Sequence, residues 1–173
     1  MIIFITGGSG SGKSEYAENL AVNLSQQEKG NLVYVATMEP LDEESKRRVH
    51  RHQKMRAGKN FETRECYTHL EKLVVKKNEI LLLECLSNLT ANEMFSEAGR
   101  KNEIAEVIQR GICNLAKYCQ HFILVGNNVF EDGITYDKMT ANYLKQMAVL
   151  HRFLGTKADK VIEIIYGIPV IWK

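Results

Sequence analysis

The chain has 173 residues, of which 45% are hydrophobic and 25% are charged, and its formal net charge at pH 7 is +2. This length and composition are typical of a globular protein with a hydrophobic core, and we expect a single domain over residues 1–173. The small net charge argues against an extensive nucleic-acid surface, and the lack of an apolar run of about 18 residues argues against a membrane span. We therefore expect neither nucleic acid nor a membrane as a partner.

The cysteines indicate a reducing compartment. Cys66, Cys85, Cys113 and Cys119 lack the C-x-x-C spacing that is typical of a structural zinc site. We expect mostly buried, reduced thiols in a cytoplasmic protein. Because the chain opens with an apolar run and a glycine-rich loop, we also expect no signal peptide.

The first predicted elements surround a glycine-rich motif at residues 6–14, Thr-Gly-Gly-Ser-Gly-Ser-Gly-Lys-Ser. An apolar strand at 2–5 precedes it and an amphipathic helix at 15–24 follows, which is the context of a phosphate-binding loop (P-loop). Glycines let the backbone N–H groups point at a phosphate, and the helix N-terminus adds positive potential. A glycine-rich turn without a ligand is the alternative, but it does not explain the complete G-x-x-x-x-G-K-S spacing. We expect nucleotide binding by Gly7, Gly8, Ser9, Gly10, Ser11, Gly12, Lys13 and Ser14, with Lys13 on the outer phosphates and Ser14 on Mg²⁺.

Strands and helices alternate along the rest of the chain. Hydrophobic patterns predict further strands at 32–37, 80–85, 122–125, 161–165 and 170–172, and a short extended piece at 61–66. They predict further helices at 41–56, 70–74, 88–95, 104–119 and 143–154. This alternation predicts an α/β, P-loop NTPase-like fold with a mostly parallel sheet, flanking helices and a C-terminal antiparallel hairpin at the sheet edge.

Ligands of open α/β sheets bind where the strands end, which brings the P-loop near residues 36–37, Glu84 and the loop at 127–128. Glu84 ends an apolar strand, as the acid of a Walker B segment does. It could bind Mg²⁺, directly or through water, or orient an attacking hydroxyl group. A capping or solvent-facing carboxylate is the alternative interpretation.

The predicted helix at 41–56 carries a basic cluster. Arg48, His52 and Arg56 are spaced four residues apart and share one face. Neighbouring cations favour the neutral, nucleophilic form of a histidine and attract a triphosphate. From spacing alone, a solvated basic helix with little to bury is the commoner explanation.

In the order of its motifs the chain resembles the adenosylcobinamide kinase/adenosylcobinamide-phosphate guanylyltransferase family. The resemblance is clear from residue 1 to about residue 95. Besides the P-loop it rests on Arg-Val-His-Arg-His at 48–52, Glu-Cys-Tyr-Thr-His-Leu at 65–70 and Leu-Leu-Glu-Cys-Leu at 82–86.

The resemblance implies a bifunctional enzyme. It would phosphorylate a hydroxyl group of adenosylcobinamide, take GMP from GTP onto a histidine, and pass GMP to the phosphorylated corrinoid. The catalytic residues would be His52, Lys13 and Glu84. The cofactors would be GTP, with ATP as the alternative donor in the kinase step, and Mg²⁺ on Ser14 and Glu84. Further nucleotide contacts would come from Ala36, Thr37, Met38, Gln53, Lys54, Met55, Arg56, Glu65 and Glu84. A carboxylate at Glu65 suits the N–H and amino donors of guanine. The resemblance also implies a homotrimer.

The second half of the chain departs from the family pattern. The family's Asn-Glu-Val-Gly loop is replaced by residues 127–133, so its acid is missing or displaced to Glu131. Leu144, Lys145, Ala148 and His151 stand where the family has Arg, Asp, Gly and Asn. These changes concern the corrinoid and the kinase step more than nucleotide binding. Two alternatives therefore stay open: an enzyme with one activity or another substrate, and a non-catalytic GTP-binding regulatory module.

Overall fold

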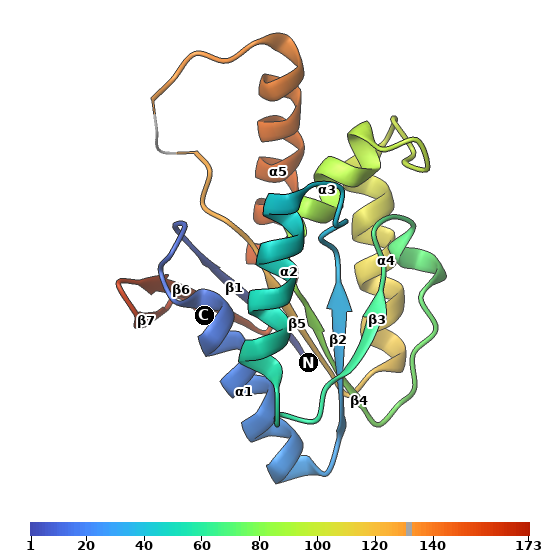
Figure 1. The fold of residues 1–173 in the computed structure, drawn as a ribbon, viewed down its shortest axis with the longest axis vertical. Helices are drawn as coiled ribbons and strands as arrows, with labels where there is room; N and C mark the ends of the chain where they lie inside the picture. The colour runs from blue at the N-terminus through green and yellow to red at the C-terminus, as the bar shows by residue number, and fades with distance from the viewer. Residues whose placement is uncertain (131–132) are drawn as a thin grey trace.

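The computed structural model describes residues 1–130 and 133–173, and its strands form a seven-stranded sheet flanked by helices (Figure 1). The strands are β1 (Ile2–Gly7), β2 (Asn31–Ala36), β3 (Glu62–Glu65), β4 (Glu79–Leu83), β5 (His121–Val125), β6 (Lys160–Ile165) and β7 (Ile168–Ile171). The helices are α1 (Lys13–Glu28), α2 (Glu43–Arg56), the short 3₁₀ helix η1 (Leu70–Lys72), α3 (Leu86–Phe95), α4 (Ile104–Tyr118) and α5 (Lys138–Lys157).

The strand order is β3-β2-β4-β5-β1-β6-β7, and every neighbouring pair is parallel except β6 and β7. The predicted mostly parallel α/β sheet with an antiparallel C-terminal hairpin is thereby confirmed. In parallel strands the carboxyl ends lie at one edge of the sheet, so the loops after β1, β2, β4 and β5 meet there.

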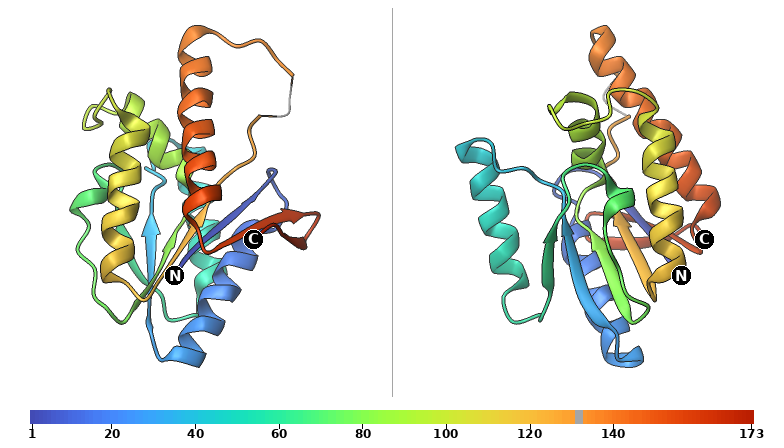
Figure 2. Two further views of the ribbon diagram at one scale, coloured as in Figure 1. Left: turned by 180° about the vertical axis from the view of Figure 1, so that it is seen from behind. Right: turned by 90° about the vertical axis from the view of Figure 1, so that its right-hand side faces the viewer.

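The sheet is covered on both faces because successive strand residues point in opposite directions. In β1, Ile3 and Ile5 pack with Ala17 of α1, whereas Phe4 belongs to the core formed with α3, α4 and α5. Figure 2 shows the same division, with α1 and α2 on one side of the sheet and α4 and α5 on the other. The two apolar layers hold the strand ends in fixed positions.

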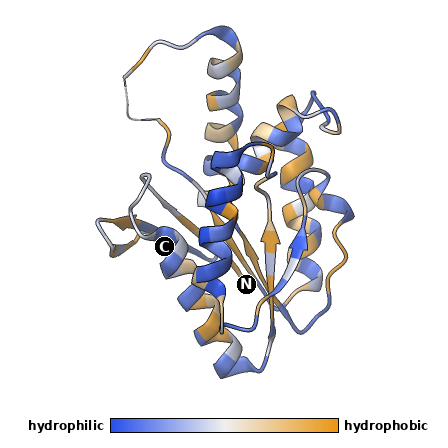
Figure 3. Ribbon diagram, viewed as in Figure 1, coloured by the Kyte–Doolittle hydropathy of each residue, from blue (hydrophilic) through white to orange (hydrophobic). Residues whose placement is uncertain are grey.

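Helix α2 differs from the other helices in its composition. It is mostly hydrophilic in Figure 3, and Arg56 is the buried one among its described residues. Its first turn is stabilised by a capping box, in which the Asp42 side chain accepts a hydrogen bond from Ser45 N and Ser45 Oγ accepts one from Asp42 N. The predicted charged helix with little to bury is confirmed, although it begins at residue 43 and not at 41.

Several local predictions are corrected by the structure. The helix predicted at 70–74 is wrong, since only the 3₁₀ turn of η1 forms: Leu70 is buried but Val74 is 79% exposed. Helix α5 begins earlier than its apolar pattern because Asp137 caps it by accepting hydrogen bonds from the first-turn N–H groups. The thiols are free as predicted, but only Cys66 of the four is buried, while the others are partly exposed.

In the described part of the chain, no helix combines the length and the apolar character that crossing a membrane requires.

The turn between β6 and β7 reaches the P-loop, where Gly167 N donates a hydrogen bond to Ser11 O at 2.9 Å. Just after the end of β7, Trp172 Nε1 donates a hydrogen bond to Glu163 Oε2 of β6 at 3.1 Å.

Candidate functional site

The P-loop follows β1 and leads into α1, and two glycines fix its path. Gly7 has a φ of 151°, and a Cβ there would lie 2.5 Å from the carbonyl oxygen of Ile164 on β6. Gly12, the N-cap of α1, has a φ of 91° and carries no side chain that could occupy the first N–H groups of the helix. Lys13 is buried, its Nζ donates to Gly8 O at 2.8 Å, and burial lowers its pKa. The loop therefore has the backbone geometry of an anion site.

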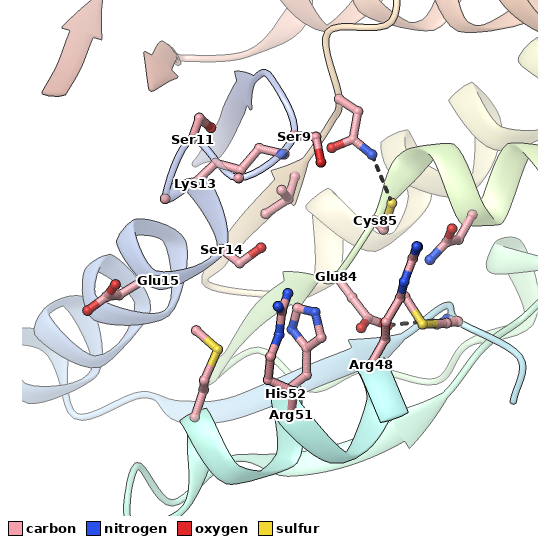
Figure 4. A pocket seen from close by; sticks show the side chains of 17 residues that line it. Ser9, Ser11, Lys13, Ser14, Glu15, Arg48, Arg51, His52, Glu84 and Cys85 are labelled. Carbon is pink, nitrogen blue, oxygen red and sulfur yellow. Dashed lines mark hydrogen bonds between the residues drawn. The ribbon is translucent and has the colours of Figure 1, made fainter. Parts of the chain in front are cut away.

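A cavity of about 650 Å³ lies between the P-loop, α2 and the carboxyl ends of β4 and β5 (Figure 4). Most of the predicted site residues are brought together there. In Figure 4, His52 and Arg51 rise from α2 beside Ser14, with Glu84 next to them. The cavity is lined by Ser9, Gly10, Ser11, Gly12, Lys13, Ser14, Glu15, Met38, Arg48, Arg51, His52, Met55, Glu84, Cys85, Asn88, Val125 and Asn127. We call it the main cavity.

Glu84 is held in place by the loop that follows β2. Its Oε2 accepts hydrogen bonds from Thr37 N at 3.0 Å and Met38 N at 3.2 Å, and the residue is 8% exposed. Thr37 is fully buried, and its Oγ1 donates to Cys85 O at 2.9 Å. Glu84 is thus a positioned, buried carboxylate and not a solvent-facing one, and Thr37 acts on it through its backbone.

His52 is half-buried and its side chain lines the main cavity. Its Nδ1 is buried and has no hydrogen-bond partner among the described residues. Burial lowers the pKa of His52; the charge of Glu84 acts in the opposite direction, and Arg51 and Arg56 lower the pKa further. A ring that stays neutral near pH 7 retains the lone pair that a nucleophile needs.

Arg56 borders a smaller cavity of about 60 Å³, which adjoins His52 and Glu84. Its guanidinium carbon lies 3.3 Å from the centre of the Tyr34 ring, and the side chain is buried. The smaller cavity is lined by Tyr34, Ala36, Met38, Pro40, Val49, His52, Gln53, Arg56, Thr63, Glu65, Tyr67 and Glu84.

A few predicted residues lie outside both cavities. Gly7 and Gly8 belong to the P-loop but line neither cavity. Lys54 is exposed on α2 and also lines neither cavity. Of the predicted loop at 127–128, Asn127 lines the main cavity, and its Nδ2 donates to Cys85 Sγ at 3.6 Å. Glu131 lies outside the described residues.

The structure adds residues to the site that sequence reasoning missed. Arg51 and Asn88 line the main cavity, and Tyr34 supports Arg56. Tyr34 could have been found, because it alternates with Ala36 and so points to the same face of β2. His151, at a position where the family pattern differs, packs edge-on between Phe4 and Phe130, with ring centres 5.0 and 5.2 Å apart, and lies outside the cavities.

Comparisons with solved structures agree with this fold. In solved structures, an ATPase domain matches with a TM-score of 0.52 and 13% identity, covering 94% of this chain and 68% of that one. A KaiC-like protein from Pyrococcus horikoshii matches with a TM-score of 0.53 and 14% identity, covering 94% and 69%. At these identities the likeness shows the fold alone.

The sequence comparisons go further. The bifunctional adenosylcobalamin biosynthesis proteins CobU of Escherichia coli and Salmonella typhimurium are 31% and 30% identical, and each match covers 98% of both chains. The family described as cobinamide kinase / cobinamide phosphate guanyltransferase matches residues 3–171. The chain therefore belongs to the cobinamide kinase / cobinamide phosphate guanyltransferase family.

Proposed function

We propose that one site of this enzyme carries both reactions of its family, with GTP bound in the main cavity and His52 as the residue that carries GMP. The observation that supports this assignment is the joint presence, around one cavity, of the P-loop and a half-buried histidine with a lowered pKa. The non-catalytic alternative does not account for Lys13, Ser14, His52 and Glu84 lining that cavity together.

In the guanylylation step, a lone pair on a ring nitrogen of His52 attacks the α-phosphorus of GTP. A P–N bond forms, the bond from the α-phosphorus to the bridging oxygen breaks, and pyrophosphate leaves with that electron pair. Arg51 and Lys13 line the cavity on opposite sides, so they can stabilise the charge that develops on the phosphates. Burial keeps the imidazole neutral before the attack.

In the kinase step, a hydroxyl oxygen of adenosylcobinamide attacks the γ-phosphorus, and GDP leaves, or ADP if ATP is the donor. Glu84, held by two backbone N–H groups, would accept the hydroxyl proton. The Ser14 hydroxyl and the Glu84 carboxylate line the same cavity, and such oxygen ligands suit Mg²⁺. When bound there, Mg²⁺ would neutralise phosphate charge.

For the base, we assign the smaller cavity beside Arg56. Its volume of about 60 Å³ is too small for a whole purine, so it would receive only the guanine edge that carries the ring N–H and the amino group. Glu65 lines this cavity and can accept hydrogen bonds from both donors. Lys54 is exposed, so its part would be limited to long-range attraction.

The wider assignments are a single domain over residues 1–173, a cytoplasmic location where GTP is supplied, and a homotrimer. The seven described strands in a single sheet support the single domain. Exposed apolar side chains on the C-terminal hairpin, Ile168 at 65%, Ile171 at 71% and Trp172 at 67%, support self-association. Sedimentation equilibrium tests the trimer.

Labelling with α-labelled GTP tests the role of His52. The parent protein should form an acid-labile protein-bound label and release pyrophosphate, and His52→Ala should form none. His50→Ala is the matched control, because His50 is exposed on the same helix and lines neither cavity. Equal labelling of His52→Ala and the parent would overturn the assignment.

The same assay separates the alternatives. Labelling without phosphorylation of adenosylcobinamide would indicate an enzyme with the transferase activity alone. Tight GTP binding with no pyrophosphate release would indicate a regulatory module.

A further inference from the structure

A second cavity, of about 270 Å³, lies between the start of α2 and α3. Neither the P-loop nor the guanine assignment uses it. It shares Met38, Arg48 and Asn88 with the main cavity, so these three residues form the boundary between the two spaces. A ligand in the second cavity would reach the contents of the main cavity at this boundary.

The charges of the second cavity disfavour a nucleoside triphosphate. Glu39, Asp42 and Glu44 line it, against the single cation of Arg48. Three carboxylates against one guanidinium repel the several charges of a triphosphate, whereas carboxylates can accept hydrogen bonds from N–H groups of a ligand, and Arg48 at the boundary can hold a single phosphate group. The second cavity therefore suits one end of the acceptor substrate and not a second nucleoside triphosphate.

The boundary itself offers hydrogen-bond donors. Asn88 Nδ2 is buried and has no partner among the described residues, although buried polar groups are normally paired. Among the residues that the structure describes, Arg48 pairs with Glu44 alone, one turn earlier on the exposed surface of α2, and such surface ion pairs contribute little and exchange readily. An amide donor and a guanidinium together match the oxygens of a phosphate monoester.

We propose that the second cavity receives the phosphate-bearing end of the phosphorylated corrinoid, and that Arg48 and Asn88 hold this phosphate at the boundary, beside the GMP carried by His52. This proposal rests on the proposed function of His52. It adds the acceptor site and the two residues that recognise the acceptor by its phosphate.

The transfer of GMP from His52 to the acceptor then takes place at that boundary. An oxygen of the acceptor phosphate forms a bond to the phosphorus of GMP, while the P–N bond to His52 breaks. The electron pair of that bond returns to the ring nitrogen, and the other ring nitrogen keeps its proton, so neutral imidazole is restored. The product is a diphosphate linkage between the corrinoid and guanosine.

A single-turnover chase tests the acceptor site. Parent protein and the variants Arg48→Met and Asn88→Ala are first labelled with α-labelled GTP and freed of nucleotide. Adenosylcobinamide phosphate is then added, and the loss of label is followed at increasing acceptor concentration. The second-order rate constant of the chase should fall about 10-fold or more in Arg48→Met and about 3-fold to 10-fold in Asn88→Ala, because each removes a charged or amide hydrogen bond to phosphate.

Arg47→Met is the matched control, since Arg47 is exposed on the same helix and lines neither cavity; its chase should equal that of the parent. Arg48→Lys should recover part of the lost rate. Prior labelling of each variant shows that it is folded and binds GTP. If the parent takes no label, the proposed function fails; if Arg48→Met and Asn88→Ala are labelled and chased at the parent's rate, the acceptor site is overturned.

Discussion

The P-loop and α2 face each other across the main cavity, but they are held there in different ways. The P-loop is anchored by β1 and α1, whose Ile3, Ile5 and Ala17 are buried in the sheet core. Helix α2 has Arg56 as its buried residue, and that side chain rests on Tyr34. One wall is thus fixed by apolar burial, and the other by a capping box, one cation–π contact and surface ion pairs.

The two walls can therefore supply different properties to the site. Close apolar packing holds the backbone atoms within a narrow range of positions. This suits N–H groups that must match the positions of phosphate oxygens. A polar helix with few buried contacts has lower local stability, and small changes in it should alter chemistry at His52 more than nucleotide binding. Substitutions in the two walls test this contrast.

The largest effect is expected from the fixed wall. Lys13→Ala removes the buried ammonium group of the P-loop, and both phosphate chemistries should slow about 100-fold or more, because the lost charge stabilises the transition state. Turnover of GTP, measured as pyrophosphate release and as phosphorylation of adenosylcobinamide, gives the two rates. A loss confined to one of them would contradict a shared phosphate site; Lys29→Ala, on an exposed residue after α1, is the control.

A smaller effect is expected in the titration of His52. Burial lowers its pKa and Arg51 and Arg56 contribute, so the midpoint of the ring's titration should lie below about 6.5, the ordinary histidine pKa. The NMR titration of the ring signal that is missing in His52→Ala measures this directly. Arg51→Gln should move the midpoint upward, because it removes a charge that disfavours the imidazolium. A midpoint at or above 6.5 in the parent would mean that α2 leaves His52 in water.

The smallest effect is expected at the start of α2. Asp42→Ala removes the N-cap and should destabilise the first turn by about 1 kcal/mol, whereas Asp42→Asn should keep most of it, since both Asp and Asn cap helices well. Hydrogen exchange of the first-turn amides should accelerate about fivefold in Asp42→Ala. Equal exchange in Asp42→Ala and the parent would show that α2 is held by other contacts.

Features of the fold that depend on local pattern could be predicted from the sequence. The continuous apolar runs of β1, β4 and β5 and the complete P-loop spacing determine the central sheet and its phosphate site. Predictions failed where few residues carried the pattern. The helix expected at 70–74 rested on Leu70, Leu73 and Val74, and only the first of these is buried.

The site could be predicted in part, for a related reason. The rule that ligands bind at strand ends correctly brought Glu84 to the P-loop, but helical spacing made Arg48, His52 and Arg56 equivalent. The structure gives them three environments: exposed, half-buried in the main cavity, and buried on Tyr34. That difference depends on the main cavity and on Tyr34, which lie against α2. The residue spacing within α2 carries no information about them. The second cavity combines α2, α3 and the loop between β2 and α2, so it too could not be predicted from any one segment.

The contact between Gly167 and Ser11 has a practical consequence. The chain contains a single tryptophan, Trp172, and it lies at the end of the hairpin whose turn touches the P-loop. Its indole is 67% exposed and bonded to Glu163, which pairs in register with Thr6 just before the P-loop. This one indole is therefore linked to the P-loop through the hairpin, so its fluorescence can be tested as an intrinsic reporter of nucleotide binding, and affinity tags are better attached away from the last residues of the chain.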